Sequence, residues 1–225
     1  MAKLGLGINV LEAAQKRIEW TFDNFERVYL SFSAGKDSTV MLHLTAIEAR
    51  KRGVKIGLLL VDLEGQYKMT IYHAHEMIKE YADVLEVHWI CLPLSLRNAV
   101  SVYEPQWTCW DKDVKEDWIR EVPEIGIIDE SFFPFFVKNM EFEDFVPKFG
   151  DWYAQGKTTA CLVGIRTDES LNRWRTIAST SKETKDGKQY TTRVTEDVYN
   201  VYPIYDMKTE DIWVYHAKNK DKRYN

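Results

Sequence analysis

The sequence predicts an open, mostly parallel α/β sheet of about five strands, with helices on both faces and one aromatic-rich insertion. Short apolar runs alternate with segments of helical periodicity, as in βαβ units. The run at residues 56–61 is apolar throughout, which is typical of a strand that helices cover on both faces. A loop of small and polar residues, 31–38, joins the first strand to a helix. With 225 residues, 45% of them hydrophobic, the chain can form one such domain.

The first βαβ unit is predicted from residues 8 to 61. Apolar residues recur at three- and four-residue spacing over 8–26, which indicates an amphipathic helix before the first strand. That strand is expected at Val28–Leu30, extended by Phe32. We expect the next helix to begin with Ser38 as its N-cap and to end at Gly53, a residue that suits a C′ position. The second strand follows at 56–61.

The later elements are less regular. Strands are predicted at Glu86–Leu92, Thr158–Ile165 and Val198–Ile204, followed by a closing helix at 208–218. Between about residues 100 and 156 the alternation of strands and helices stops and aromatic residues accumulate. We interpret this segment as an insertion or lid whose aromatic residues form a small satellite core or stack on a ligand or partner. The cysteine expected nearest the surface is Cys109.

The 31–38 loop has the features of a phosphate-binding turn. Ala34 and Gly35 allow a ligand to approach the backbone, and the first N–H groups of the following helix lack helical partners and carry partial positive charge. A Walker loop is excluded because Leu30 stands where its first glycine belongs and Asp37 follows Lys36. The other glycine-rich stretch, at 5–7, follows no strand and lacks the third glycine of a dinucleotide fingerprint.

Two other strand ends carry candidate binding residues, because ligands of open α/β sheets bind outside the carboxyl ends of the strands. Asp62 and Glu64 follow the second strand and are candidates for a ribose or metal contact, or alternatively for capping the next helix. Arg166 and Arg173 follow the fourth strand and are suited to phosphate or sulfate. If a helix begins at Arg166, the two arginines share one face of it. Residues 166–193 hold seven Lys or Arg and four acidic residues, a local charge of +3.

Charge and cysteine content exclude several classes of function. The net charge of −5 argues against overall attraction to nucleic acid or to an anionic membrane, although a local basic patch remains open. The sequence shows no apolar run of membrane-spanning length and no signal-peptide core, so we expect a cytoplasmic protein without membrane contact. Three widely separated cysteines form no zinc-binding or redox pair, and reduced, mostly buried thiols are expected.

The S-x-G-K-D-S pattern at 33–38 resembles the pyrophosphate-binding loop, or PP-loop, of the adenine nucleotide α-hydrolase superfamily. Together with G-I-R-T-D-E-S at 164–170, Arg173, and the segment from Tyr202 to Trp213, it resembles the phosphoadenosine phosphosulfate (PAPS) reductase and sulfate adenylyltransferase small-subunit family over residues 28–217. The aromatic insertion, with W-T-C-W at 107–110, is similar to that of the immunoglobulin-binding regulator A group, described as prophage-gene co-activators.

The resemblance implies roles for matching residues. The loop that would hold the terminal phosphates comprises Ser31, Ser33, Ala34, Gly35, Lys36, Asp37 and Ser38. Within it, Asp37 would help to place Mg²⁺. Adenine would be recognised by the backbone at Val61, Asp62 and Leu63. The phosphates or sulfate would lie near Gly164, Arg166 and Arg173, with Asp168 and Glu169 orienting the arginines. The catalytic candidates are Lys36, Asp37, Arg166 and Arg173.

The family implies an enzyme that uses ATP and Mg²⁺, cleaves the α–β phosphate bond, and adenylylates an acceptor such as sulfate or a nucleic-acid-linked group. The alternative is a nucleotide-binding regulatory subunit that acts in gene expression or on DNA with a protein partner or as an oligomer. A sulfonucleotide such as PAPS or adenylyl sulfate is an alternative ligand. Reduction of it is disfavoured, because the C-terminal E-C-G-x-H segment of assimilatory reductases has no counterpart after Cys161.

Overall fold

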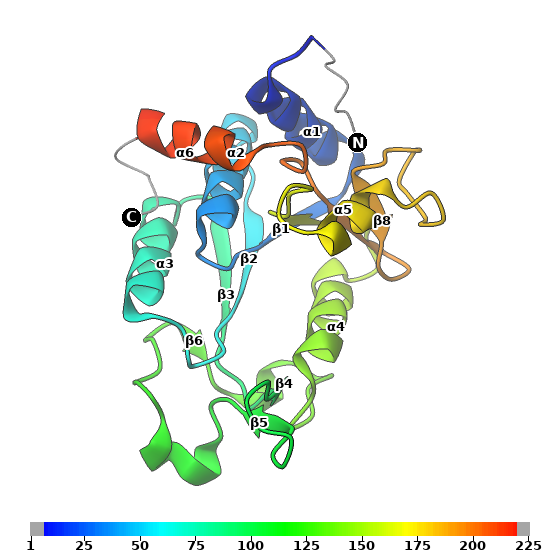
Figure 1. Cartoon of the computed structure of the whole chain (residues 1–225). Coiled ribbons are helices and arrows are strands. Elements are labelled where there is room, and N and C mark those ends of the chain that lie inside the picture. Colours follow the sequence, from blue (N-terminus) through cyan, green and yellow to red (C-terminus); the bar gives the residue numbers. More distant parts are fainter. Residues whose placement is uncertain (1–6, 220–225) are drawn as a thin grey trace.

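The computed structural model describes residues 7–219, which form a seven-stranded sheet with helices on both faces (Figure 1). The strand order is β6-β3-β2-β1-β7-β9-β8, and only the β8–β9 pairing is antiparallel. The strands are β1 (Arg27–Ser31), β2 (Ile56–Val61), β3 (Leu85–Ile90), β6 (Gly126–Ile127), β7 (Thr159–Val163), β8 (Thr191–Arg193) and β9 (Val198–Val201). The predicted mostly parallel α/β sheet is therefore confirmed. The two strands beyond the expected five are the short edge strands β6 and β8.

Six α-helices are present in the described part of the chain. They are α1 (Val10–Asn24), α2 (Lys36–Arg52), α3 (Lys68–Glu80), α4 (Phe142–Ala154), α5 (Leu171–Ala178) and α6 (Thr209–Lys218). Helix α2 packs against α1 and α6 (Figure 1), whereas α4 packs against β7 and β9. Gly57 of β2 permits the close approach of α4, because a Cβ there would lie 2.7 Å from the Cζ atom of Tyr153. None of the described helices has the length and apolar character needed to cross a bilayer.

The start of α2 differs from the prediction, whereas its end confirms it. Gly35, with φ −84° and ψ 168°, is the N-cap, and Ser38 is the third residue of the helix. The Ser38 hydroxyl donates to the Gly35 carbonyl at 3.0 Å and therefore does not cap the first turn. The extended backbone of Gly35 starts the helix without a side-chain cap, which the sequence pattern did not reveal. At the other end, Gly53 adopts φ 66°, the left-handed conformation expected of a C′ glycine.

The chain reverses its direction across the sheet at β1. The segments β1, α2, β2, α3 and β3 progress toward one edge, and α4 then leads back to β7 on the other side of β1. The carboxyl end of β1 is therefore a topological switch point, where open α/β sheets bind ligands. The loop that follows β1 is the predicted phosphate-binding segment.

The aromatic region is divided between an insertion and the main core. The insertion, residues 91–141, contains the hairpin strands β4 (Ser95–Arg97) and β5 (Gln106–Thr108), edge strand β6, and the short 3₁₀ helices η1 (Lys112–Asp117) and η2 (Glu130–Phe132). The later aromatic residues belong to α4, where Phe145 and Phe149 are fully buried in the same cluster as the sheet residues. The expected satellite core is therefore continuous with the main core. Cys109 is also buried, contrary to expectation, and its thiol lies 3.5 Å from the Leu92 carbonyl oxygen and 3.6 Å from the Leu94 carbonyl oxygen.

Two buried acidic residues after β2 hold the insertion. The Glu64 carboxylate accepts hydrogen bonds from the backbone N–H groups of Trp110, at 2.7 Å, and Ile119, at 3.0 Å. The Asp62 carboxylate accepts from Trp89 Nε1 at 2.8 Å and pairs with Arg120. Neither carboxylate caps α3, whose N-cap is Tyr67. Both carboxylates therefore anchor the insertion through protein donors, and their contact with a ribose or a metal stays a prediction.

Replacing Glu64 with alanine should loosen the insertion. The substitution leaves the buried Trp110 N–H and the part-buried Ile119 N–H without their acceptor, so we expect the free energy of unfolding to fall by about 2 kcal/mol. Hydrogen exchange at the Trp110 and Ile119 amides should accelerate. The exposed Glu116, in the same insertion, provides the control, because Glu116→Ala should change stability by less than about 0.5 kcal/mol. Equal exchange rates in the two variants would contradict the anchoring role.

Candidate functional site

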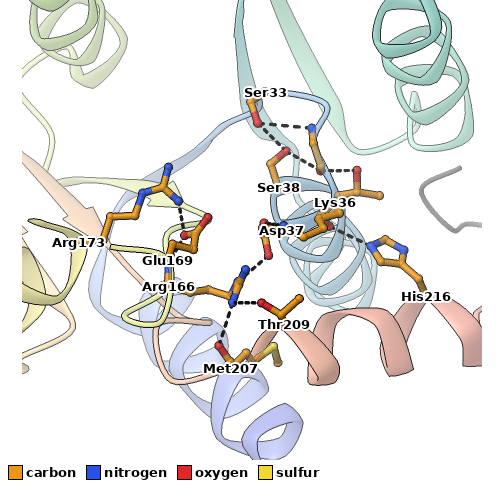
Figure 2. Close-up of polar contacts among 12 residues, drawn as sticks. Ser33, Lys36, Asp37, Ser38, Arg166, Glu169, Arg173, Met207, Thr209 and His216 are labelled. Carbon is orange, nitrogen blue, oxygen red and sulfur yellow. Dashed lines mark hydrogen bonds and ion pairs between the residues drawn. The ribbon is translucent and has the colours of Figure 1, made fainter. Parts of the chain in front are cut away.

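The loop after β1 leads into the N-terminus of α2, whose first backbone N–H groups have no side-chain cap. Ala34 has φ 55°, a left-handed conformation that turns the chain from β1 into α2. No side-chain hydrogen bond caps the α2 N-terminus at Gly35. The Ser33 hydroxyl lies 3.1 Å from the Ser38 hydroxyl and 3.4 Å from the Gly35 nitrogen, which closes the loop on itself (Figure 2). The first-turn N–H groups of α2 thus form a site suited to an anion.

A cavity of about 310 Å³ opens beside this loop. The ends of β1 and β2 form its floor, and Thr70, Ile71 and Ala74 of α3 with Phe142 and Val146 of α4 complete its lining. Six predicted binding residues line it together: Ser31, Ser33, Ala34, Val61, Asp62 and Leu63. The structure therefore brings together the loop and the β2 turn, although helix α2 and strand β2 separate them in sequence. Phe142, Val146 and Ile71 had no motif that marked them as site residues, and only their position in the fold does so.

An ion cluster fixes the start of α2. The Asp37 carboxylate accepts a hydrogen bond from Lys36 Nζ at 2.7 Å and from Arg166 Nε at 2.6 Å (Figure 2). Arg166 is only 2% exposed, and its Nη1 atom also lies 3.5 Å from the Met207 carbonyl oxygen and 3.4 Å from the Thr209 hydroxyl. The cluster therefore connects the loop to the end of β7 and to the start of α6.

Two further contacts support the same loop. His216 of α6 donates from Nε2 to the Lys36 carbonyl at 2.9 Å, and burial lowers the pKa of His216, which favours its neutral form. Gly164, at the end of β7, lies against the first turn of α2, because a Cβ there would be 3.3 Å from the backbone nitrogen of Ser38. His216 carried no sequence signal for this site, whereas Gly164 was part of the recognised motif.

The two candidate arginines occupy different environments. Helix α5 begins at Leu171 and is capped by Ser170, whose hydroxyl accepts from the Arg173 N–H at 3.2 Å. Arg166 therefore lies before the helix, and the prediction that both arginines share one helical face is wrong. Glu169 does lie beside both, since it accepts from the Arg166 backbone N–H at 2.8 Å and pairs with the Arg173 guanidinium. The Arg173 side chain is 43% exposed. Asp168 is exposed in the same turn, and its orienting role stays a prediction.

The three cysteine thiols are poorly suited to take part in chemistry at this site. All three cysteines are buried and free. Burial raises the pKa of Cys109 to about 11 and that of Cys161 to about 12, and it raises the pKa of Cys91 further. Thiolate chemistry at neutral pH is therefore disfavoured for each of them. No group of three or more His, Cys, Asp or Glu side chains suited to a metal ion occurs within residues 7–219.

Because Arg166 is buried and Arg173 is exposed, replacing Arg166 should reduce stability more than replacing Arg173. Arg166→Ala removes one of the two cations paired with the poorly exposed Asp37 in the described residues and leaves it with Lys36, so we expect the free energy of unfolding to fall by about 3 kcal/mol. Arg173→Ala removes an exposed pair and should cost less than about 1 kcal/mol. Chemical denaturation of both variants measures the difference. Equal losses would show that the Asp37–Arg166 pair is not the main support of the loop.

Comparisons with known proteins identify the family. The chain is 44% identical over 221 residues to "Uncharacterized protein YbdN" of Escherichia coli strain K12, which covers 97% of this chain and 54% of YbdN. The chain thus spans about half the length of that relative. Among solved structures, PAPS reductase from Candida auris, as a phosphate complex, is 14% identical, with 97% of this chain and 89% of that chain covered and a TM-score of 0.49.

A second solved structure, the U34-tRNA thiolase NcsA from Methanococcus maripaludis, is 12% identical, with 96% of this chain and 65% of that chain covered and a TM-score of 0.48. The model of the phosphoadenosine phosphosulfate reductase domain matches residues 27–225, which include the phosphate loop, the insertion and the arginine segment. The chain therefore belongs to the phosphoadenosine phosphosulfate reductase domain family.

Proposed function

We propose that this domain binds ATP with Mg²⁺, cleaves the bond between the α and β phosphates, and transfers the adenylyl group to an acceptor. The observation that carries the proposal is the uncapped N-terminus of α2, which lies beside a 310 Å³ cavity at the switch point of the sheet. The phosphates of a nucleotide would bind at the helix N-terminus, and its base would occupy the cavity.

The lining of the cavity suits a purine base. Its floor and walls include Leu59, Val61, Ile71 and Val146, which offer apolar contact to a planar ring. The backbone at Val61 and Leu63 lies at the same cavity, where it can recognise the ring edge by hydrogen bonds. The Leu63 carbonyl already accepts from the Gly65 N–H at 2.6 Å, so a ligand would use its second lone pair.

Lys36 and Asp37 change partners in this proposal. Lys36 is 27% exposed and can turn from the Asp37 carboxylate to a phosphate oxygen. Asp37 then keeps Arg166 on Oδ1 and has Oδ2 available as an oxygen ligand for Mg²⁺, which prefers carboxylate and phosphate oxygens. Bound Mg²⁺ would supply charge neutralisation on the phosphates. The residues present therefore fit the ion, with one carboxylate from the protein.

The reaction then depends on electrostatics and positioning. Negative charge accumulates on the pyrophosphate leaving group, and the α2 N–H groups with Lys36 would stabilise it there. Arg166 would act as a positioning residue, since its guanidinium contacts Asp37, Met207 and Thr209. The raised pKa values of the buried thiols favour this chemistry over a mechanism that uses one of these cysteines as a nucleophile.

Lys36→Ala should weaken ATP binding by about tenfold to over a hundredfold, because it removes a charge-assisted contact of roughly 1.5–3 kcal/mol. Calorimetry with ATP and Mg²⁺ measures the affinity, and AMP and pyrophosphate formation measures turnover. Lys51→Ala is the matched control, since Lys51 lies in the last turn of the same helix and pairs with Glu19 and Glu48.

The outcomes of this experiment separate the candidate functions. Equal ATP affinity in the wild type and Lys36→Ala would contradict the site. ATP binding that depends on Lys36 without formation of AMP would support the nucleotide-binding regulatory alternative over the enzyme.

A further inference from the structure

A second cavity, of about 290 Å³, adjoins the proposed nucleotide cavity. The two share Ser31, Phe142 and Val146 as lining residues. They also lie on one face of the sheet, since residues paired across neighbouring strands share a face, as do residues two apart on one strand. Tyr29 is in register with Cys161, which is in register with Asn200 of the second cavity. Ser31, two residues after Tyr29, is in register with Leu59 of the nucleotide cavity. A molecule in the second cavity would therefore lie next to the nucleotide, across the end of β1.

The chemistry of the second cavity does not suit an oxyanion. Among the described residues its lining contains no Lys or Arg, and its one charged residue is the exposed Glu143 in the first turn of α4. Asn200 and Ser31 add polar groups, and the rest of the lining is aromatic or apolar, including Pro147, Val194 and Val198. A sulfate or sulfonate ion there would meet a carboxylate without a cationic partner. An organic cation with an apolar body would satisfy both parts of the lining.

We propose that the second cavity is the site of a second substrate, a small molecule with an ammonium group on an apolar body, recognised by Glu143. This inference rests on the proposed function, because it assigns the cavity to the partner of the nucleotide in that reaction. Sulfate, one of the acceptors that the family resemblance implies, is then excluded from this cavity. The basic side chains predicted to bind phosphate or sulfate are absent from its lining: Lys36 and Arg166 pair with Asp37, and Arg173 pairs with Glu169.

Two probes with similar apolar chains and opposite charges test the proposal. The full chain is saturated with the non-hydrolysable α,β-methylene analogue of ATP and Mg²⁺, and binding of n-butylammonium or n-butanesulfonate is measured by saturation-transfer NMR. We expect butylammonium to bind and butanesulfonate to give no saturable signal. Glu143→Gln should weaken butylammonium binding by about two- to fivefold, the range of an exposed ion pair.

Two variants test the location. Asp144→Asn removes the neighbouring charge on the same first turn of α4, and Asp144 is absent from the lining, so it should leave butylammonium affinity unchanged. Val194→Phe should abolish the butylammonium signal by filling the cavity. Val194 is 39% exposed, which limits the cost of this substitution to folding. It does not line the nucleotide cavity, so affinity for the ATP analogue should be unchanged.

Any of three results would overturn the inference. Butanesulfonate could bind as tightly as butylammonium, or neither Glu143→Gln nor Val194→Phe could reduce butylammonium binding. Butylammonium could also bind only when the ATP analogue is absent. Calorimetry with the ATP analogue alone distinguishes failure of the proposed function from failure of the second-substrate site. If the analogue fails to bind the wild type, the proposed function fails; if it binds and butylammonium does not, only the second-substrate site fails.

Discussion

The Asp37 carboxylate, shared between Lys36 and Arg166, is the interaction on which the site depends. Burying either Asp37 or Arg166 without its partner would be costly, so the fold must bring β7 and the start of α2 together. The contacts of Arg166 and His216 with the start of α6 and with the Lys36 carbonyl extend this constraint to a third segment. Together they fix the direction in which the first N–H groups of α2 point, before any ligand binds.

The polar groups at the carboxyl ends of the strands have two different roles, to hold the insertion and to offer a site for a ligand. Asp62 and Glu64 have backbone and side-chain donors as partners and hold the insertion beside the cavity. The α2 N-terminus has no side-chain cap. Helix α4 then covers the same face of the sheet and contributes Phe142 and Val146 to both cavities. The position of α4, and therefore the shape of both cavities, depends on the absence of a side chain at Gly57.

Local signals predicted much of this arrangement, and tertiary contacts decided the rest. The β2 strand, the N-terminal helix and the Gly53 terminus follow from periodicity and backbone preference, and the phosphate loop follows from its spacing. Ser38 and the two arginines were misjudged because helix starts depend on which residue takes the extended cap conformation, here Gly35 and Ser170. β6 and β8 are too short to show periodicity, and the burial of Cys109 follows from contacts distant in sequence. Similarity to the immunoglobulin-binding regulator A group stays a prediction.

The most direct test of the account is the location of the adenine ring. An ATP analogue with a photoreactive azide on adenine would be cross-linked to the full chain, and the labelled peptides identified by mass spectrometry. The account predicts labelling within residues 59–74 or 142–146, the segments that contribute lining residues to the cavity from β2, α3 and α4, and protection from labelling by excess ATP. Labelling confined to the basic segment 166–193, or labelling that ATP does not reduce, would contradict it.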